Sequence, residues 1–146
     1  MSFVNDLRVW RAERNIKEPN YPQYIRNVLE ELLEPLYDKE FIPKKVDEIW
    51  NEHFLNREFN TTTDKVLDSM NDICVFSFNE IELMGYDCNL TMNETIKEIS
   101  SRKQNPIQKE QWAKFGSYGK WEKSLLQDES TLYKADYGIC KLKDSL

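Results

Sequence analysis

The chain has 146 residues, of which 40% are hydrophobic and 32% are charged. This length is typical of one domain, and the composition is too apolar for a disordered chain and too polar for a membrane protein. The formal net charge of -6 argues against a nucleic-acid binder, because phosphate contacts require a basic surface.

The first half of the sequence predicts two helices separated by a breaker cluster at residues 18–22. The chain contains only four glycines and five prolines, which favours long helices with few turns. From Gln23 the apolar residues recur at helical spacing as far as Leu36. The second helix is expected to kink or stop at Pro35, whose ring would clash with the carbonyl of Glu31.

Two further helices are expected in the middle of the chain. Residues 44–54 place Val46, Ile49 and Trp50 on one face of a short helix. A longer helix is expected over residues 64–84, because an N-cap cluster at residues 60–64 precedes it and Gly85 follows it.

The last predicted helix begins at the capping box Thr91-Met92-Asn93-Glu94 and ends before Pro106. The remainder has no clean period. The sequence therefore predicts an all-α bundle of four to five helices, with a helical core at residues 1–104 and an irregular tail at residues 105–146 that packs on the bundle.

The cysteines and the start of the chain indicate a cytoplasmic protein. Cys74, Cys88 and Cys140 are odd in number and lack the C-x-x-C spacing of a zinc site, so reduced thiols are expected. The first residues lack a signal-peptide pattern, and no apolar run approaches the length of a membrane span. No membrane association is expected.

Acidic residues gather on two of the predicted helices. Glu30, Glu31 and Glu34 are three or four positions apart and can converge on one side of the second helix. Asp68 and Asp72 are four positions apart in the middle of the long helix, where Asp is a poor helix former. Mg²⁺ would relieve the repulsion in both clusters, with Mn²⁺ as an alternative, whereas the simpler interpretation is solvated helix surface.

These clusters carry a resemblance to a known family. The signature of the MazG-like all-α nucleoside triphosphate pyrophosphohydrolases is E-x-x-E on one helix and E-x-x-D on the next. Glu31-x-x-Glu34 matches the first half, and Asp72 matches the final Asp of the second half. Ser69 stands where the family has its second Glu, and the nearest acid is Asp68. The chain resembles phage and bacterial members of this family over residues 1–103.

The resemblance implies Mg²⁺-dependent hydrolysis of a (deoxy)nucleoside triphosphate to a monophosphate and pyrophosphate, which would control a nucleotide pool. It implies that Glu31, Glu34 and Asp72 are catalytic. It also implies that the metal ligands come from the whole acidic set, namely Glu30, Glu31, Glu34, Asp68 and Asp72.

The implied nucleotide contacts come from two other segments. Residues 98–103 resemble the family helix that brings basic side chains to the triphosphate, so Arg102 and Lys103 are candidate phosphate ligands. Lys97 is a further basic candidate for the same role. Asn5 and Trp10 lie on the N-terminal helix, which approaches the base in such relatives. A purely structural alternative for Arg102 and Lys103 is stabilisation of the C-terminal end of their helix through its macrodipole.

Two expectations concern partners. Helix pairs of this length bury little surface alone, so a homodimer or homotetramer is expected. The rival to the enzyme is a non-catalytic helical interaction protein whose acidic face binds a basic partner. The division of charge favours the enzyme, since residues 1–90 carry 18 acidic and 10 basic side chains and residues 91–146 carry 8 acidic and 10 basic ones.

Overall fold

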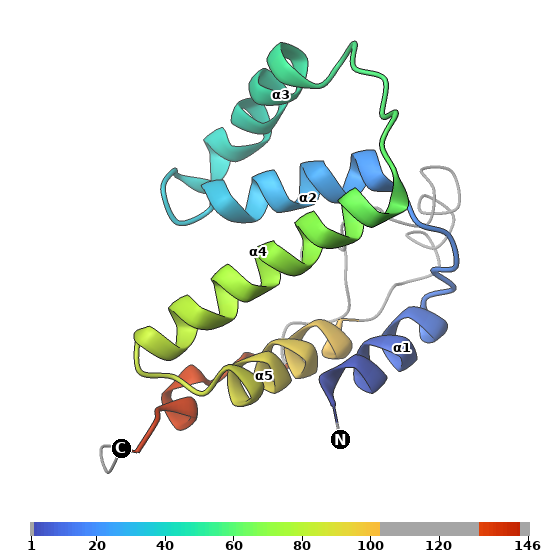
Figure 1. Ribbon diagram of the computed structural model, residues 1–146. Helices are drawn as coiled ribbons and strands as arrows, with labels where there is room; N and C mark the ends of the chain where they lie inside the picture. Colours follow the sequence, from blue (N-terminus) through green and yellow to red (C-terminus); the bar gives the residue numbers. More distant parts are fainter. Residues whose placement is uncertain (1, 103–131, 144–146) are drawn as a thin grey trace.

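The computed structural model describes residues 2–102 and 132–143. Their helices, shown in Figure 1, are α1 (Phe3–Glu13), α2 (Tyr21–Leu33), the 3-10 helix η1 (Lys39–Phe41), α3 (Ile42–His53), α4 (Thr63–Leu83), α5 (Cys88–Ser101) and the 3-10 helix η4 (Tyr137–Cys140). The described residues form no strand beyond an isolated bridge between Tyr86 and Lys141. The all-α prediction is confirmed. Within the same residues, no helix is both long and apolar enough to cross a membrane.

Helices α2 and α3 form an antiparallel pair. The Asn20 side chain accepts a hydrogen bond from the Gln23 N–H at 3.1 Å and caps the start of α2. The helix ends at Leu33, just before Glu34 and Pro35, so the predicted stop at the proline is confirmed. Ile42 and Val46 of α3 are buried. Arg26 of α2 forms an ion pair with Asp47 of α3, which ties the two helices together.

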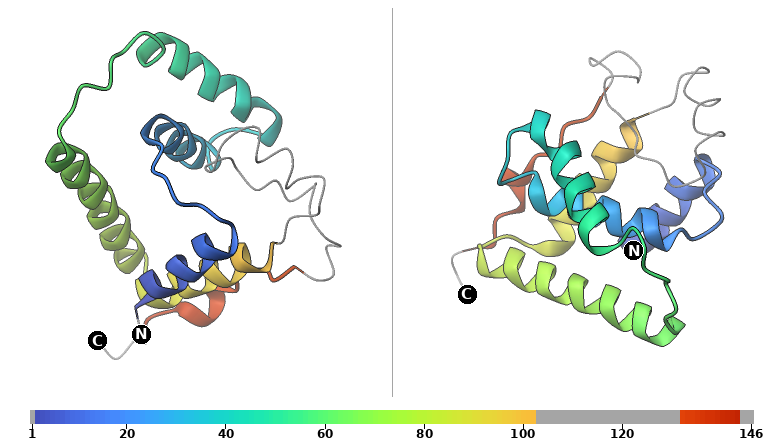
Figure 2. Two further views of the ribbon diagram at one scale, coloured as in Figure 1. Left: turned by 90° about the vertical axis from the view of Figure 1, so that its right-hand side faces the viewer. Right: turned by 90° about the horizontal axis from the view of Figure 1, so that it is seen from above.

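Helix α5 is the best-packed helix of the described chain. It lies beside α1 on one side and beside residues 132–143 on the other, as both views in Figure 2 show. Backbone hydrogen bonds join the C-terminal segment to the start of α5, from the Asp87 N–H to the Cys140 carbonyl at 2.8 Å and from the Leu142 N–H to the Gly85 carbonyl at 2.9 Å. This part of the predicted tail therefore packs on the helices.

The predicted start of the last helix is wrong by one turn. Asp87 caps α5, because its carboxylate accepts the Leu90 N–H at 2.9 Å. Thr91 already lies within the first turn, where its hydroxyl donates to the Cys88 carbonyl at 3.2 Å. Glu94 is not a capping residue and is buried instead. The predicted stop at Pro106 and the candidate Lys103 lie outside the described residues.

Helix α4 links the α2–α3 pair to α5 and makes few contacts with either (Figures 1 and 2). Its predicted ends are confirmed, since Thr62 caps it through the Lys65 N–H at 3.3 Å and Gly85 follows its end with φ +91°. None of its 21 residues is buried.

Candidate functional site

A cavity of about 730 Å³ lies between α1, α5 and the C-terminal segment. Two of the predicted nucleotide-binding residues, Trp10 and Lys97, line it together. The other lining residues are Asp6, Val9, Glu13, Leu90, Asn93, Glu94, Ile96, Ser100, Ile139 and Cys140. Its wall is therefore mainly apolar with a few charged groups, which is typical of small-molecule sites.

The Trp10 ring is contacted by Arg14, but its ring nitrogen forms no hydrogen bond with the described residues. The guanidinium of Arg14 lies 4.9 Å from the centre of the Trp10 ring, and it also donates a 2.6 Å hydrogen bond to the Arg102 carbonyl at the end of α5. The indole Nε1 of Trp10 is buried and has no hydrogen-bond partner in the described structure. A buried donor without a partner is costly, so this nitrogen lowers the stability of the packing around Trp10.

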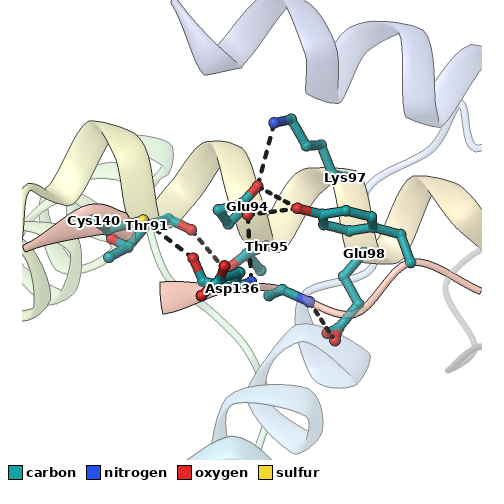
Figure 3. A network of polar contacts seen from close by, with 9 residues as sticks. Thr91, Glu94, Thr95, Lys97, Glu98, Asp136 and Cys140 are labelled. Atoms are coloured by element: carbon teal, nitrogen blue, oxygen red, sulfur yellow. Dashed lines mark hydrogen bonds and ion pairs between the residues drawn. The ribbon is translucent and has the colours of Figure 1, made fainter. Parts of the chain in front are cut away.

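Glu94 provides a buried carboxylate at the cavity wall (Figure 3). It is 2% exposed, and its two oxygens accept hydrogen bonds from the Tyr133 hydroxyl at 2.5 and 2.9 Å. The Asp136 N–H donates to the same carboxylate at 3.3 Å, and the Lys97 ammonium lies 3.3 Å from it. This network fastens residues 133–136 to α5.

The network changes the acidity of both partners. The hydrogen bond from Tyr133 lowers the pKa of Glu94 below its ordinary value and outweighs the opposing effect of burial, and Lys97 acts in the same direction as Tyr133. The same bond to Glu94 raises the pKa of Tyr133 to about 12. Glu94 is therefore ionised at neutral pH and Tyr133 is protonated.

Lys97 is the cation of the cavity. Its side chain is 63% exposed, and its ammonium pairs with the Glu94 carboxylate at 3.3 Å.

The remaining predicted nucleotide contacts lie outside the cavity wall. Asn5 is on α1 and accepts a 2.9 Å hydrogen bond from Arg8. Arg102 follows the end of α5, where its guanidinium pairs with Glu98 at 3.5 Å.

The predicted metal ligands lie on other helices. Glu30 and Glu31 are in the last turn of α2 and Glu34 follows it, with Glu30 half-buried and the other two exposed. Asp68 and Asp72 are exposed on α4.

Among the residues that the structure describes, no three acidic, histidine or cysteine side chains are grouped closely enough to hold a metal ion. The acidic residues of α2 and α4 therefore do not complete a magnesium site within the described part of one chain.

The sequence analysis missed Glu94, Tyr133 and Asp136 as residues that shape the cavity. Glu94 was interpreted as a capping residue, and Tyr133 and Asp136 lie in a segment without periodicity. The signal that was present is the acidic residue at position 94 between the apolar residues Met92 and Ile96, which indicates a carboxylate on a buried face.

Comparisons of this chain with protein-family models, with curated proteins and with solved structures found no match.

Proposed function

We propose that the chain binds a nucleoside triphosphate in the cavity between α1 and α5 and hydrolyses it to a monophosphate and pyrophosphate with the help of Mg²⁺. The observation that carries the proposal is the shared cavity of Trp10 and Lys97. The two residues are far apart in the sequence, and both are candidate nucleotide contacts, Trp10 through the family resemblance and Lys97 as a further basic residue beside the segment that carries it.

The cavity suits the two ends of a nucleotide. The Trp10 ring offers an aromatic face for a base. Lys97 supplies the positive charge for a phosphate oxygen.

The metal belongs to the proposal through the acidic residues of α2 and α4. Bound Mg²⁺ would neutralise charge on phosphate oxygens and lower the pKa of a coordinated water. Because those carboxylates do not complete a site within the described part of one chain, we assign no catalytic step to a single copy.

The location and assembly follow from the same proposal. Cys74, Cys88 and Cys140 are free, which is compatible with the reducing cytoplasm, where nucleotide pools are found. A homodimer or homotetramer is proposed because few side chains are buried within the described chain.

The rival function is a non-catalytic interaction protein that binds a basic partner through its acidic helices. The observation that favours it is the exposure of Asp68 and Asp72 on α4, since the described residues include no group that could hold a metal ion. A basic partner would pair with such carboxylates as well as a metal would.

The test is a panel of ribo- and deoxynucleoside triphosphates with Mg²⁺, scored for pyrophosphate release. The proposal predicts release from at least one nucleotide by the wild type and a large loss in Glu34→Gln. Glu52→Gln, which removes an exposed carboxylate from α3, is the matched control and should keep the wild-type rate. No release from any nucleotide would leave the interaction protein as the better account.

A further inference from the structure

The C-terminal segment (residues 132–143) is held on α5 mainly by polar bonds. Within these residues only Cys140 is buried, whereas Tyr137 is 45% exposed and Ile139 is 66% exposed. Detachment replaces a hydrogen bond by one to water, but it has no such replacement for a buried apolar contact. A segment fastened in this way leaves its helix at a lower free energy than unfolding of the whole chain requires.

The Glu94 carboxylate gathers the central bonds of this segment (Figure 3). It accepts the Tyr133 hydroxyl and the Asp136 N–H, which lie three positions apart in the segment. Water can take the place of both donors once the segment leaves, so the ionised carboxylate is stable with and without its cover. A buried apolar side chain at position 94 would lack this property.

The other side-chain bonds to the segment come from the same side of α5. Besides Glu94, the residues of α5 that form them lie three positions apart, namely Thr95, Glu98 and Ser101. Their bonds to residues 133–137 are 2.9, 3.2 and 2.9 Å long, in that order. Because one short stretch makes all these bonds to one helix side, loss of the central bonds weakens the rest, and the segment is expected to detach as a unit.

The far end of the segment reaches the cavity between α1 and α5. Cys140 is 0% exposed, and it lines the cavity together with Ile139. Detachment of the segment would therefore expose the Cys140 thiol and remove part of the cavity wall. A molecule that fills the cavity contacts this wall only while the segment is attached, so binding and attachment favour each other.

We propose that residues 132–143 open and close over α5 as a unit fastened by the Glu94 carboxylate, and that a nucleotide bound in the cavity holds them closed. The second half rests on the proposed function.

The first experiment uses the Cys140 thiol to measure opening without any nucleotide. Cys74→Ser and Cys88→Ser leave Cys140 as the one cysteine of the full chain. Its reaction with an aromatic disulfide, followed by the release of the coloured thiolate, is limited by the fraction of molecules that are open. Circular dichroism checks that every variant keeps its helix content.

Tyr133→Phe in this background should speed the reaction of Cys140 at least about tenfold, because it removes the hydroxyl bonds to the ionised Glu94. Tyr37→Phe removes a hydroxyl from an exposed residue outside the segment and should leave the rate unchanged. If Tyr133→Phe fails to fold, Ser101→Ala takes its place, since it removes the acceptor of the Tyr133 N–H. A variant of the segment that reacts at the background rate would overturn opening as a unit.

The dependence of the same rate on urea separates local opening from unfolding of the chain. Local opening exposes little surface, so the rate should change little at low urea concentrations. A rate that rises with urea as steeply as the unfolding equilibrium constant would mean that Cys140 is reached only in the unfolded chain, and this result would also overturn the proposal.

The second experiment tests the effect of a nucleotide at a group outside the cavity. The Leu142 N–H donates to the Gly85 carbonyl, and neither residue lines the cavity, so a ligand there does not shield this amide directly. A saturating non-hydrolysable triphosphate analogue, with binding verified by calorimetry, should slow hydrogen exchange of the Leu142 amide at least about tenfold. An analogue that binds without slowing this exchange would refute the link between the cavity and the segment.

The outcomes separate this inference from the proposed function. An analogue that does not bind contradicts the nucleotide site and the second half of the proposal, whereas opening as a unit is decided by the Cys140 rates alone. A wild type that releases pyrophosphate while Cys140 reacts only through unfolding does the reverse.

Discussion

Helices α4 and α5 follow each other in the chain and are both amphipathic, but they differ in what surrounds them. Helix α5 buries Glu94 and Ile96 between α1 and the C-terminal segment. Helix α4 is longer and buries no residue. The comparison shows that described elements enclose α5, whereas they only half-bury α4 at four positions, namely Val66, Met70, Phe78 and Ile81.

The two helices also divide the proposed chemistry. Lys97 and Glu94 on α5 line the cavity with Trp10, and this arrangement is present within a single chain. Asp68 and Asp72 on α4 stand on an exposed surface. The candidate nucleotide cavity is therefore lined by α5, whereas the candidate metal ligands of α4 do not line it.

The largest expected effect concerns the metal side. Glu34→Gln removes a ligand charge with little change in volume, so pyrophosphate release should fall by more than the roughly 10–100-fold typical of changes next to a metal site. Circular dichroism should show an unchanged helix content. Asp68→Asn should lose less activity, since Asp68 is outside the family signature, and an equal loss would make Asp68 a full ligand.

The difference in burial between α5 and α4 predicts a difference in the cost of substitutions. Ile96→Ala on α5 should lower the free energy of unfolding by about 2–5 kcal/mol, because Ile96 is 5% exposed and its removal leaves a cavity. Phe76→Ala on α4 should change it by no more than about 0.5 kcal/mol at concentrations where the chain is monomeric. Denaturant titrations measure both, and similar costs would contradict the difference between the two helices.

The third prediction concerns the network that fastens the C-terminal segment to α5. The pKa of Glu94 is lowered in the folded state, so the ionised form contributes stability above the ordinary pKa of 4.5, and this contribution is lost as the pH falls. Tyr133→Phe removes the main cause of the shift. Its melting temperature should be several degrees below that of the wild type at neutral pH.

The difference between Tyr133→Phe and the wild type should shrink as the pH falls toward about 3. Thermal melts across this range measure it. A difference that stays constant with pH would mean that Tyr133 acts through packing and not through the Glu94 carboxylate.

The smallest expected effect separates two basic residues of the same helix region. Lys97→Ala should weaken binding of a non-hydrolysable triphosphate analogue several-fold, because Lys97 lines the cavity. Arg102→Ala should weaken it less and should alter stability by about 0.3–0.5 kcal/mol, the value of a helical i,i+4 ion pair such as that with Glu98. Titration calorimetry of the analogue measures both affinities. A larger loss of affinity in Arg102→Ala than in Lys97→Ala would indicate that Arg102 binds the phosphates.

The helices were largely predictable because their signals are local. Each signal acts on the turn next to it. Pro35 and Gly85 mark the ends of α2 and α4, and Thr62 marks the start of α4. The start of α5 was missed because two capping signals compete within one turn, and Asp87 forms the cap instead of Thr91.

The site was less predictable because it depends on contacts between distant segments. The meeting of Trp10 with Lys97 requires the packing of α1 on α5, and the burial of Glu94 requires Tyr133 from a segment without helical period. Periodicity predicts which face of a helix is apolar, but it does not predict which element covers that face.

The most direct test of the difference between α4 and α5 is hydrogen exchange of their backbone amides in the wild-type chain. The account predicts stronger protection in α5, which buries Glu94 and Ile96, than in α4, which buries no residue. Protection of α4 that is as strong as that of α5 would contradict it.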